Sequence, residues 1–286
     1  MKTKIPALVT IALIAAFVSS CAAPPAEKQN INLKGSDTML QLGQRWAEVF
    51  MKDHPSATIQ VTGGGSGTGI AALINGTTEI CQSSRPIKDE EKVSVKQQRN
   101  AEVSEIPVAV DALAVYLNNA SSIDHLTMEQ VRRIFQGEIT NWKEVGGKPG
   151  NILLYGRENS SGTYVFFKEH VLANGDFADK YQPLGGTAAV INAVVKDVNG
   201  VGYGGIGYAK DIKTISIAKD ATSEPVAPTM DNALSNKYPL SRFLFWYIAG
   251  APAGTAKELT DWVLGPQGQG VVKEVGFYPL KGNDTP

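Results

Sequence analysis

The sequence is poor in the residues that build metal centres, disulfides and catalytic triads. It has two cysteines and three histidines in 286 residues. The histidines, at positions 54, 125 and 170, form no i, i+4 pair, and none accompanies a serine in a G-x-S-x-G motif. We therefore expect no metal, no cofactor and no hydrolytic triad.

An excess of charge is also lacking. Without Lys2 and Lys4 the chain has 25 basic and 28 acidic residues, a formal charge of about −3. No basic face is implied, which argues against nucleic acid as a partner. Any site for an anion must therefore be local, built from a few side chains and backbone groups.

Long hydrophobic runs are missing except near the start. Ile5 to Val18 is apolar apart from Pro6 and Thr10, and its fourteen residues fall short of the ~20 that span a bilayer as a helix. The ending Val18-Ser19-Ser20-Cys21 resembles the lipobox of bacterial lipoproteins. We expect residues 1–21 to be a signal peptide, Cys21 to be lipidated, and residues 22–30 to be a flexible tether. The alternative is an ordinary signal peptide cleaved nearby.

Lipidation of Cys21 would leave Cys81 as the only thiol, which excludes an intramolecular disulfide. Cys81 lies in a short apolar segment, Glu79 to Gln82, that is typical of a strand. We expect a buried, inert thiol rather than a reactive one.

The remaining chain, about 255 residues, is patterned as an α/β protein. Three strand–turn–helix units between residues 31 and 86 indicate a mostly parallel sheet. Thr127 to Gln136 is typical of an amphipathic helix capped by Thr127. Phe243 to Ile248 contains no polar residue and predicts a fully buried strand.

The order of these elements predicts two lobes joined by two crossings. We expect the first lobe to comprise residues 31–111 with about 215–286, and the second lobe to comprise 112–214. Ile106 to Asn118, two apolar runs around Asp111, is the candidate for the first crossing.

Three turns share one design, in which small hydroxyl or glycine residues separate an apolar strand from a helix. They are Gly35–Thr38, Gly63–Gly69 and Ser160–Thr163. In open α/β sheets such turns gather at the carboxyl ends of the strands, where helix starts offer unpaired N–H groups. Any one of them could be a simple N-cap. Together they predict an oxyanion site.

Two arginines and two aspartates accompany these turns. Arg85 and Arg157 each end an apolar strand beside hydroxyl residues, where a planar guanidinium could hold an oxyanion. Asp111 interrupts two apolar runs, so it either caps a strand end at the crossing or accepts a proton from a bound anion. Asp37 is the second candidate for that acceptor, or a cap of its own turn.

These segments together resemble the periplasmic phosphate-binding proteins of ABC-type phosphate importers. The resemblance spans roughly residues 31–280, in the family's order, and its main motifs are Gly35-Ser36-Asp37-Thr38-Met39, Gly64-Gly65-Ser66-Gly67-Thr68-Gly69, Ser83-Ser84-Arg85-Pro86-Ile87, Asp111-Ala112-Leu113-Ala114-Val115 and Arg157 with Ser161-Gly162-Thr163.

The resemblance implies an α/β fold of the periplasmic binding protein type II class. Two lobes, each a mixed, mostly parallel sheet flanked by helices, would close on dehydrated phosphate in the cleft between them. The residues carried over by resemblance are Thr38, Ser66, Arg157, Ser161, Gly162 and Thr163. The turns themselves add Ser36, Asp37, Ser84, Arg85 and Asp111 as candidate phosphate-binding residues.

The chain departs from the family at one position. Longer members carry an aspartate where this chain has Ser83-Ser84-Arg85, and that aspartate accepts the phosphate proton. Here another group must accept it, and Asp111 is preferred over Asp37. An aspartate in the site would favour hydrogen phosphate, which keeps a proton at neutral pH, over sulfate, which does not.

The sequence thus predicts a monomeric, extracytoplasmic binding protein, not an enzyme, lipid-anchored to a bacterial membrane in the periplasm or on the outer face of the cytoplasmic membrane. It would pass phosphate to the membrane subunits of an ABC permease. Three alternatives stay open. They are the same fold binding sulfate, molybdate or arsenate, a secreted phosphatase with a serine nucleophile, and a phosphate sensor subunit that docks on a receptor kinase.

Overall fold

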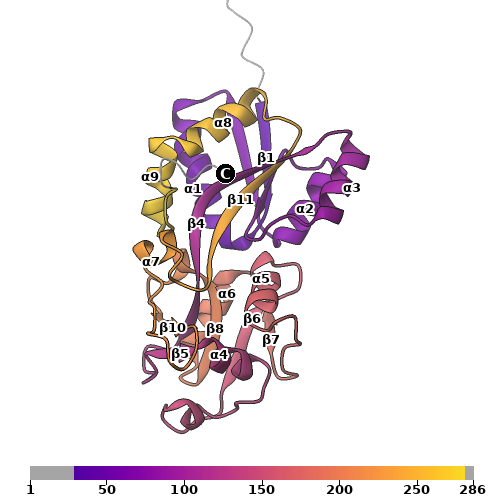
Figure 1. Ribbon diagram of the computed structural model, residues 1–286. Helices are drawn as coiled ribbons and strands as arrows, with labels where there is room; N and C mark the ends of the chain where they lie inside the picture. The colour runs from indigo at the N-terminus through magenta and orange to yellow at the C-terminus, as the bar shows by residue number, and fades with distance from the viewer. Residues whose placement is uncertain (1–28, 281–286) are drawn as a thin grey trace, which may run out of the picture.

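The computed structural model describes residues 29–280 and has two lobes stacked end to end (Figure 1). The expected signal peptide, the lipobox Cys21 and the tether up to residue 28 lie outside the described residues. Within residues 29–280 no helix combines the length and the apolar character needed to cross a membrane.

The first lobe contains the start of the described chain and the two closing helices near its end. Its strands β1, β2 and β3 are parallel neighbours in the order β2-β1-β3. The elements are β1 (Gln29–Gly35), η1 (Asp37–Met39), α1 (Leu40–Asp53), β2 (Ala57–Thr62), α2 (Ser66–Asn75), β3 (Ile80–Ser83), α3 (Asp89–Arg99), α8 (Gly254–Leu264) and α9 (Pro266–Val275).

The second lobe comes from the middle of the chain. Its parallel strands lie in the order β8-β6-β7, and a separate two-stranded sheet pairs β5 with β10. The elements are β5 (His125–Thr127), α4 (Met128–Phe135), η2 (Trp142–Val145), β6 (Leu153–Arg157), α5 (Gly162–His170), β7 (Gln182–Leu184), α6 (Thr187–Lys196), β8 (Gly200–Gly205), η3 (Ile206–Tyr208), β9 (Lys213–Thr214), β10 (Ser216–Ala218) and α7 (Met230–Leu234).

Two long antiparallel strands connect the lobes. β4 (Val103–Leu117) and β11 (Ser241–Ala249) pair with each other, β11 also pairs with β3, and β4 also pairs with β8. One continuous sheet, β2-β1-β3-β11-β4-β8-β6-β7, therefore runs through both lobes. The predicted two-lobed mixed α/β fold is confirmed, and Cys81 is a buried free thiol as expected.

Local sequence signals explain several of these elements. Thr127 caps α4 as predicted, because its hydroxyl accepts from the Gln130 N–H while the Gln130 side chain accepts from the Thr127 N–H. The buried side of this helix, Val131, Ile134 and Phe135, then packs into the core of the second lobe.

Residues 215–240, which we expected in the first lobe, pack against the second. Ile215, Ile217, Tyr238 and Leu240 are buried in the same core as α4 and α5, not in the core of the first lobe. The hydrophobic pattern alone cannot show which core a segment joins. We therefore propose to place the second crossing near Ser241, with residues 112–240 in the second lobe.

The end of the described chain forms a further contact between the lobes. Phe277 is buried in the core of the first lobe, whereas Tyr278 forms an antiparallel bridge with Val110 of β4 and packs against the core of the second. The Tyr278 hydroxyl also donates to the Pro228 carbonyl, at 2.5 Å. The sequence-based expectation of two crossings missed this third connection.

Two phenylalanines provide a test of this packing. Phe277 is 2% exposed, whereas Phe243, predicted to be fully buried, is 39% exposed. Phe277→Ala should lower the free energy of unfolding by about 3–5 kcal/mol, because it leaves a cavity in the core. The matched variant Phe243→Ala should cost under about 1 kcal/mol. Urea denaturation measures both, and equal losses would contradict this account of the core.

Candidate anion-binding site

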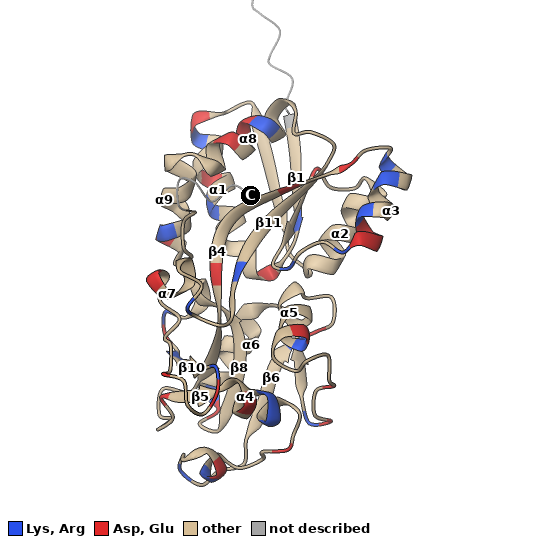
Figure 2. Cartoon of the chain, viewed as in Figure 1, with Lys and Arg blue, Asp and Glu red and all other residues tan. Residues whose placement is uncertain are grey.

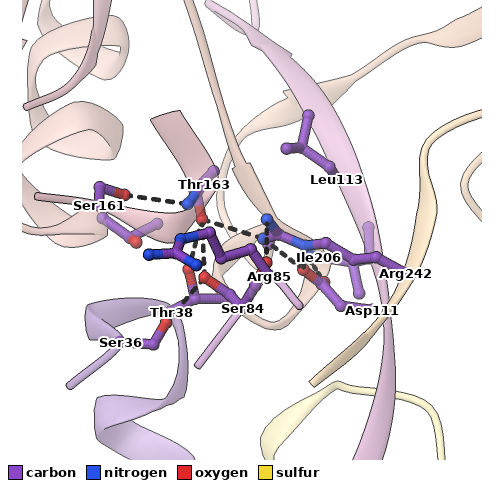
Figure 3. Close-up of polar contacts among 12 residues, drawn as sticks. Ser36, Thr38, Ser84, Arg85, Asp111, Leu113, Ser161, Thr163, Ile206 and Arg242 are labelled. Atoms are coloured by element: carbon purple, nitrogen blue, oxygen red, sulfur yellow. Dashed lines mark hydrogen bonds and ion pairs between the residues drawn. The ribbon is translucent and has the colours of Figure 1, made fainter. Parts of the chain in front are cut away.

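Hydroxyl groups from both lobes meet where the lobes face each other (Figure 3). Ser36 and Ser84 Oγ atoms lie 2.9 Å apart, and the Thr38 and Thr163 Oγ1 atoms are also 2.9 Å apart. Ser84 Oγ lies 3.4 Å from both Ser66 Oγ and Thr163 Oγ1. These five side chains are at most 2% exposed. We call them the hydroxyl cluster.

The fold explains why these turns converge. Strands β1, β2 and β3 are parallel, so the turns that follow them lie at one edge of the sheet. The turn after β6, in the second lobe, faces this edge. Helix α2 begins at Ser66, and α5 begins at Gly162 with Ser161 as its N-cap, accepting from the N–H groups of Thr163 and Tyr164. Both helix N-termini, with their partial positive charge, therefore lie at the cluster.

Arg157 lies at the end of β6 and is 1% exposed. Its guanidinium donates to Asp37 Oδ2 at 2.5 Å, to Thr187 Oγ1 at 3.2 Å and to the Leu184 carbonyl at 3.3 Å. Asp37 also accepts from the Gly64 N–H through Oδ1, at 2.9 Å. The ion pair between Asp37 and Arg157 joins the two lobes.

Arg85 is placed differently from the prediction. Its guanidinium donates to both carboxylate oxygens of Glu91, at 2.8 and 2.6 Å, and to the Pro86 carbonyl. Burial alone raises the pKa of Glu91, but hydrogen bonds from Arg85 and from the Lys88 N–H outweigh it, so this pKa lies below its usual value. Arg85 thus anchors the start of α3, and we remove it from the candidate anion ligands.

Asp111 is fully buried on β4, and its partner was missed by sequence reasoning. Arg242 stands opposite it in the antiparallel register and donates to Asp111 Oδ2 through Nε and Nη2, at 3.0 and 2.8 Å. Oδ1 accepts from the Ile206 N–H at 2.9 Å. Figure 2 shows the acidic and the basic segment side by side on β4 and β11, between the lobes. That Asp111 takes a proton from a bound anion stays a prediction.

Arg242 also contacts the hydroxyl cluster. Its Nη2 donates to Thr163 Oγ1 at 3.0 Å, and its Nη1 donates to the Ser84 carbonyl at 3.0 Å. The signal in the sequence was slight, a single charged residue directly before the apolar run of β11. A charge in such a position commonly marks the exposed end of a strand, so only the register against Asp111 distinguishes it.

Direct contacts between the lobes surround the cluster. The Gly67 N–H donates to the Ser160 carbonyl at 2.9 Å, and the Tyr208 hydroxyl donates to the Asp37 carbonyl at 2.7 Å. Gly65 has a φ of +92°, and a Cβ there would lie 2.4 Å from the Ser160 oxygen. Glycine at this position is therefore what allows the two turns to approach.

The structure brings most of the predicted site residues together, and Arg85 is the exception. The structure brings together the hydroxyl cluster, Ser161, Gly162 and the two pairs Asp37–Arg157 and Asp111–Arg242, while Arg85 turns to Glu91. The arginines and aspartates of the site balance in charge, and the donors are hydroxyls, backbone N–H groups and the Arg157 guanidinium, which has five N–H groups and donates three hydrogen bonds within the protein. Such a site suits a small tetrahedral oxyanion. Among the described residues no group of three His, Cys, Asp or Glu side chains could hold a metal.

Comparison with known proteins gives consistent matches. A family model described as a PBP superfamily domain matches residues 21–267. The phosphate-binding protein PstS of Pseudomonas aeruginosa is 37% identical over 270 residues, covering 88% of this chain and 83% of that protein. PstS of Bacillus subtilis is 29% identical over 253 residues, with coverages of 88% and 81%.

A solved structure is similar over the same range. It is a protein from Clostridium perfringens, assigned as a phosphate ABC transporter substrate-binding protein and crystallised with bound phosphate. The TM-score is 0.80 at 26% identity, and the match covers 88% of this chain and all of that one.

The contact between Arg85 and Glu91 predicts a pH-dependent stability. Arg85→Gln should lower the free energy of unfolding by about 1–3 kcal/mol at neutral pH, because Glu91 loses its charge partner. Since the folded-state pKa of Glu91 is lowered, the pair stabilises the fold above the unfolded value of about 4.3 and loses this effect as the pH falls through the folded value. Thermal melts should show the two proteins converging once the pH falls below the lowered folded-state pKa of Glu91. A gap that persists there would contradict the assignment.

Proposed function

The chain belongs to the PBP superfamily and, within it, to the PstS family of phosphate-binding proteins, and on this premise we propose that it binds inorganic phosphate and delivers it to an ABC-type phosphate permease. The observation that carries the proposal is the buried hydroxyl cluster between the lobes, with the N-termini of α2 and α5 beside it. Arg157 pairs with Asp37, the residue before Thr38 of the cluster.

The chemistry of the cluster suits phosphate. Phosphate oxygens accept hydrogen bonds, and the cluster, the backbone N–H groups of the α2 and α5 starts and Arg157 supply donors from opposite sides. Charge-assisted hydrogen bonds contribute ~1.5–3 kcal/mol each, so a handful offsets the cost of dehydrating and ordering the anion. We propose as ligand-binding residues Ser36, Thr38, Ser66, Ser84, Arg157, Ser161, Gly162 and Thr163.

We propose that Asp37 acts on the site by orienting Arg157. The Asp37 carboxylate lies 2.5 Å from Arg157 Nη2 and accepts from the Gly64 N–H, so it orients the guanidinium and the loop before α2 together. A phosphate bound beside Arg157 would compete with Asp37 for the guanidinium's charge. Hydrogen phosphate would relieve this competition by donating its proton to the Asp37 carboxylate, whereas sulfate has no proton to donate and would face unrelieved repulsion from it.

Delivery would use the two crossings as a hinge. β4 and β11 are the strands that pass between the lobes, so a bend in both would separate the turns of the first lobe from the start of α5. A permease could then distinguish the closed, loaded protein from the open one. We propose that the protein acts outside the cytoplasm as a monomer, held at a membrane by a lipid on Cys21.

Three alternatives have specific tests. A different oxyanion would use the same donors, so the ligand must be identified by titration. A phosphatase would need an activated serine, and each serine of the cluster lies against other hydroxyls rather than a histidine, which speaks against it. Absence of turnover of a chromogenic phosphate ester would close that alternative. If the protein is a sensor subunit, a pull-down with this protein as bait should capture a receptor kinase rather than a permease.

Isothermal titration calorimetry tests the proposal directly. The protein should bind phosphate and show no competition from excess sulfate, and Arg157→Ala should weaken phosphate binding at least about 100-fold, because two or more charge-assisted bonds are lost. Arg85→Gln is the matched control and should leave phosphate affinity unchanged. Sulfate binding as tight as phosphate would overturn the choice of ligand.

Gly65 gives an independent test of lobe closure. Gly65→Ala places a methyl group 2.4 Å from the Ser160 oxygen and strains a backbone at φ +92°, so the lobes should fail to meet. Phosphate affinity should fall about tenfold or more, and small-angle X-ray scattering with phosphate should show a larger radius of gyration than the wild type. Gly270→Ala, where a methyl group meets nothing within 4 Å, is the control. If the Gly65 variant with phosphate has the same radius of gyration as the wild type, the contact between Gly65 and Ser160 does not control lobe closure.

A further inference from the structure

Arg242 connects three parts of the molecule through one guanidinium. It pairs with Asp111 of β4 at the crossing, donates to the Ser84 carbonyl in the first lobe and donates to the Thr163 hydroxyl in the second. Its side chain is 3% exposed, and its Cζ atom lies 5.1 Å from the centre of the Phe166 ring of α5. A buried guanidinium held on several sides has little freedom to move.

The bond to Thr163 has a consequence for the hydroxyl proton. A guanidinium has five N–H donors and no acceptor, so Thr163 can only accept from Arg242. A threonine hydroxyl has a single proton, and that proton must therefore be donated to another partner. The remaining neighbours of Thr163 Oγ1 are the hydroxyls of Thr38, at 2.9 Å, and Ser84, at 3.4 Å, both in the cluster.

Asp111 makes this arrangement possible in a buried place. An unpaired guanidinium at this depth would cost several kcal/mol, and Asp111 offsets its charge through two hydrogen bonds. Asp111 is in turn held by the Ile206 N–H, so neither member of the pair can rotate independently. Both carboxylate oxygens of Asp111 therefore accept hydrogen bonds from the protein, and Arg242 lies between Asp111 and Thr163.

We infer that Arg242 is a positioning residue of the anion site, which Asp111 holds in place and which fixes the Thr163 hydroxyl as a donor toward the bound anion. The inference rests on the proposed function and names a residue and a contact of that same site. It assigns Asp111 an action through Arg242 rather than a direct contact with the ligand. Because the bond spans from the hinge strand to α5, the donor is oriented only when the lobes are together.

A double-mutant cycle tests this. Phosphate dissociation constants would be measured by calorimetry for Arg242→Gln, for Thr163→Val and for the double variant. Each single change should raise the dissociation constant about 10- to 100-fold, the range expected for one charge-assisted hydrogen bond. The double variant should lie within about threefold of the weaker single variant, because both changes remove the same donor. If the dissociation constant of the double variant instead rises by the product of the two single increases, Arg242 does not act through Thr163 and the inference is overturned.

The folding of the variants needs a separate readout. Melting temperatures without phosphate identify any variant that is merely unstable. Arg85→Gln serves as a buried-arginine control whose guanidinium pairs with Glu91 rather than with a side chain of the hydroxyl cluster. If Arg242→Gln does not fold, Arg242→Lys decides, since an ammonium group cannot hold Asp111, Ser84 and Thr163 in one plane. It should bind phosphate about tenfold more weakly. Unchanged affinity of the lysine variant would overturn the inference. Failure of the wild type to bind phosphate would instead reject the proposed function itself.

Discussion

The antiparallel pairing of β4 with β11 sets Asp111 opposite Arg242 at the point where the chain passes between the lobes. The same two strands pair with β3 on one side and β8 on the other, so the sheets of both lobes take their position from them. A slip of β11 by one residue against β4 would turn Arg242 to the face of the sheet opposite Asp111. The position of the lobes, the burial of the two charges and the orientation of Thr163 therefore depend on one register.

Balance of buried charge is the second constraint. Arg157, Arg242 and Arg85 are each at most 7% exposed as side chains, and each has a carboxylate partner, namely Asp37, Asp111 and Glu91. These three ion pairs are chemically alike but lie in different parts of the molecule. The Asp37–Arg157 pair joins the lobes, the Asp111–Arg242 pair lies on the two strands that connect them, and the Arg85–Glu91 pair stays within the first lobe. The Arg157 guanidinium bonds to Asp37 and the Arg242 guanidinium to Thr163, whereas the Arg85 guanidinium bonds to no side chain of the hydroxyl cluster.

Much of the fold could be read from local patterns. The strand–turn–helix units after residue 31 and the cap at Thr127 follow from side-chain chemistry over a few neighbouring positions, and the structure contains them. The differences from these expectations involve distant parts of the chain. Residues 215–240 join the second core, Phe243 is partly exposed, and Tyr278 bridges to Val110. An apolar pattern shows that a segment is buried, but not which surface buries it.

The same division holds for the site. The three hydroxyl turns and Arg157 could be identified from the sequence, because a strand followed by small polar residues and a helix start is an anion-binding arrangement by its local geometry. What only the tertiary structure decided is the partner of each charge. Arg85 and Arg157 look alike in sequence, yet one meets Glu91 six residues away and the other meets Asp37 across the lobes. Arg242 enters the site through its register with Asp111, a contact between residues 131 positions apart, and no local pattern encodes such a contact.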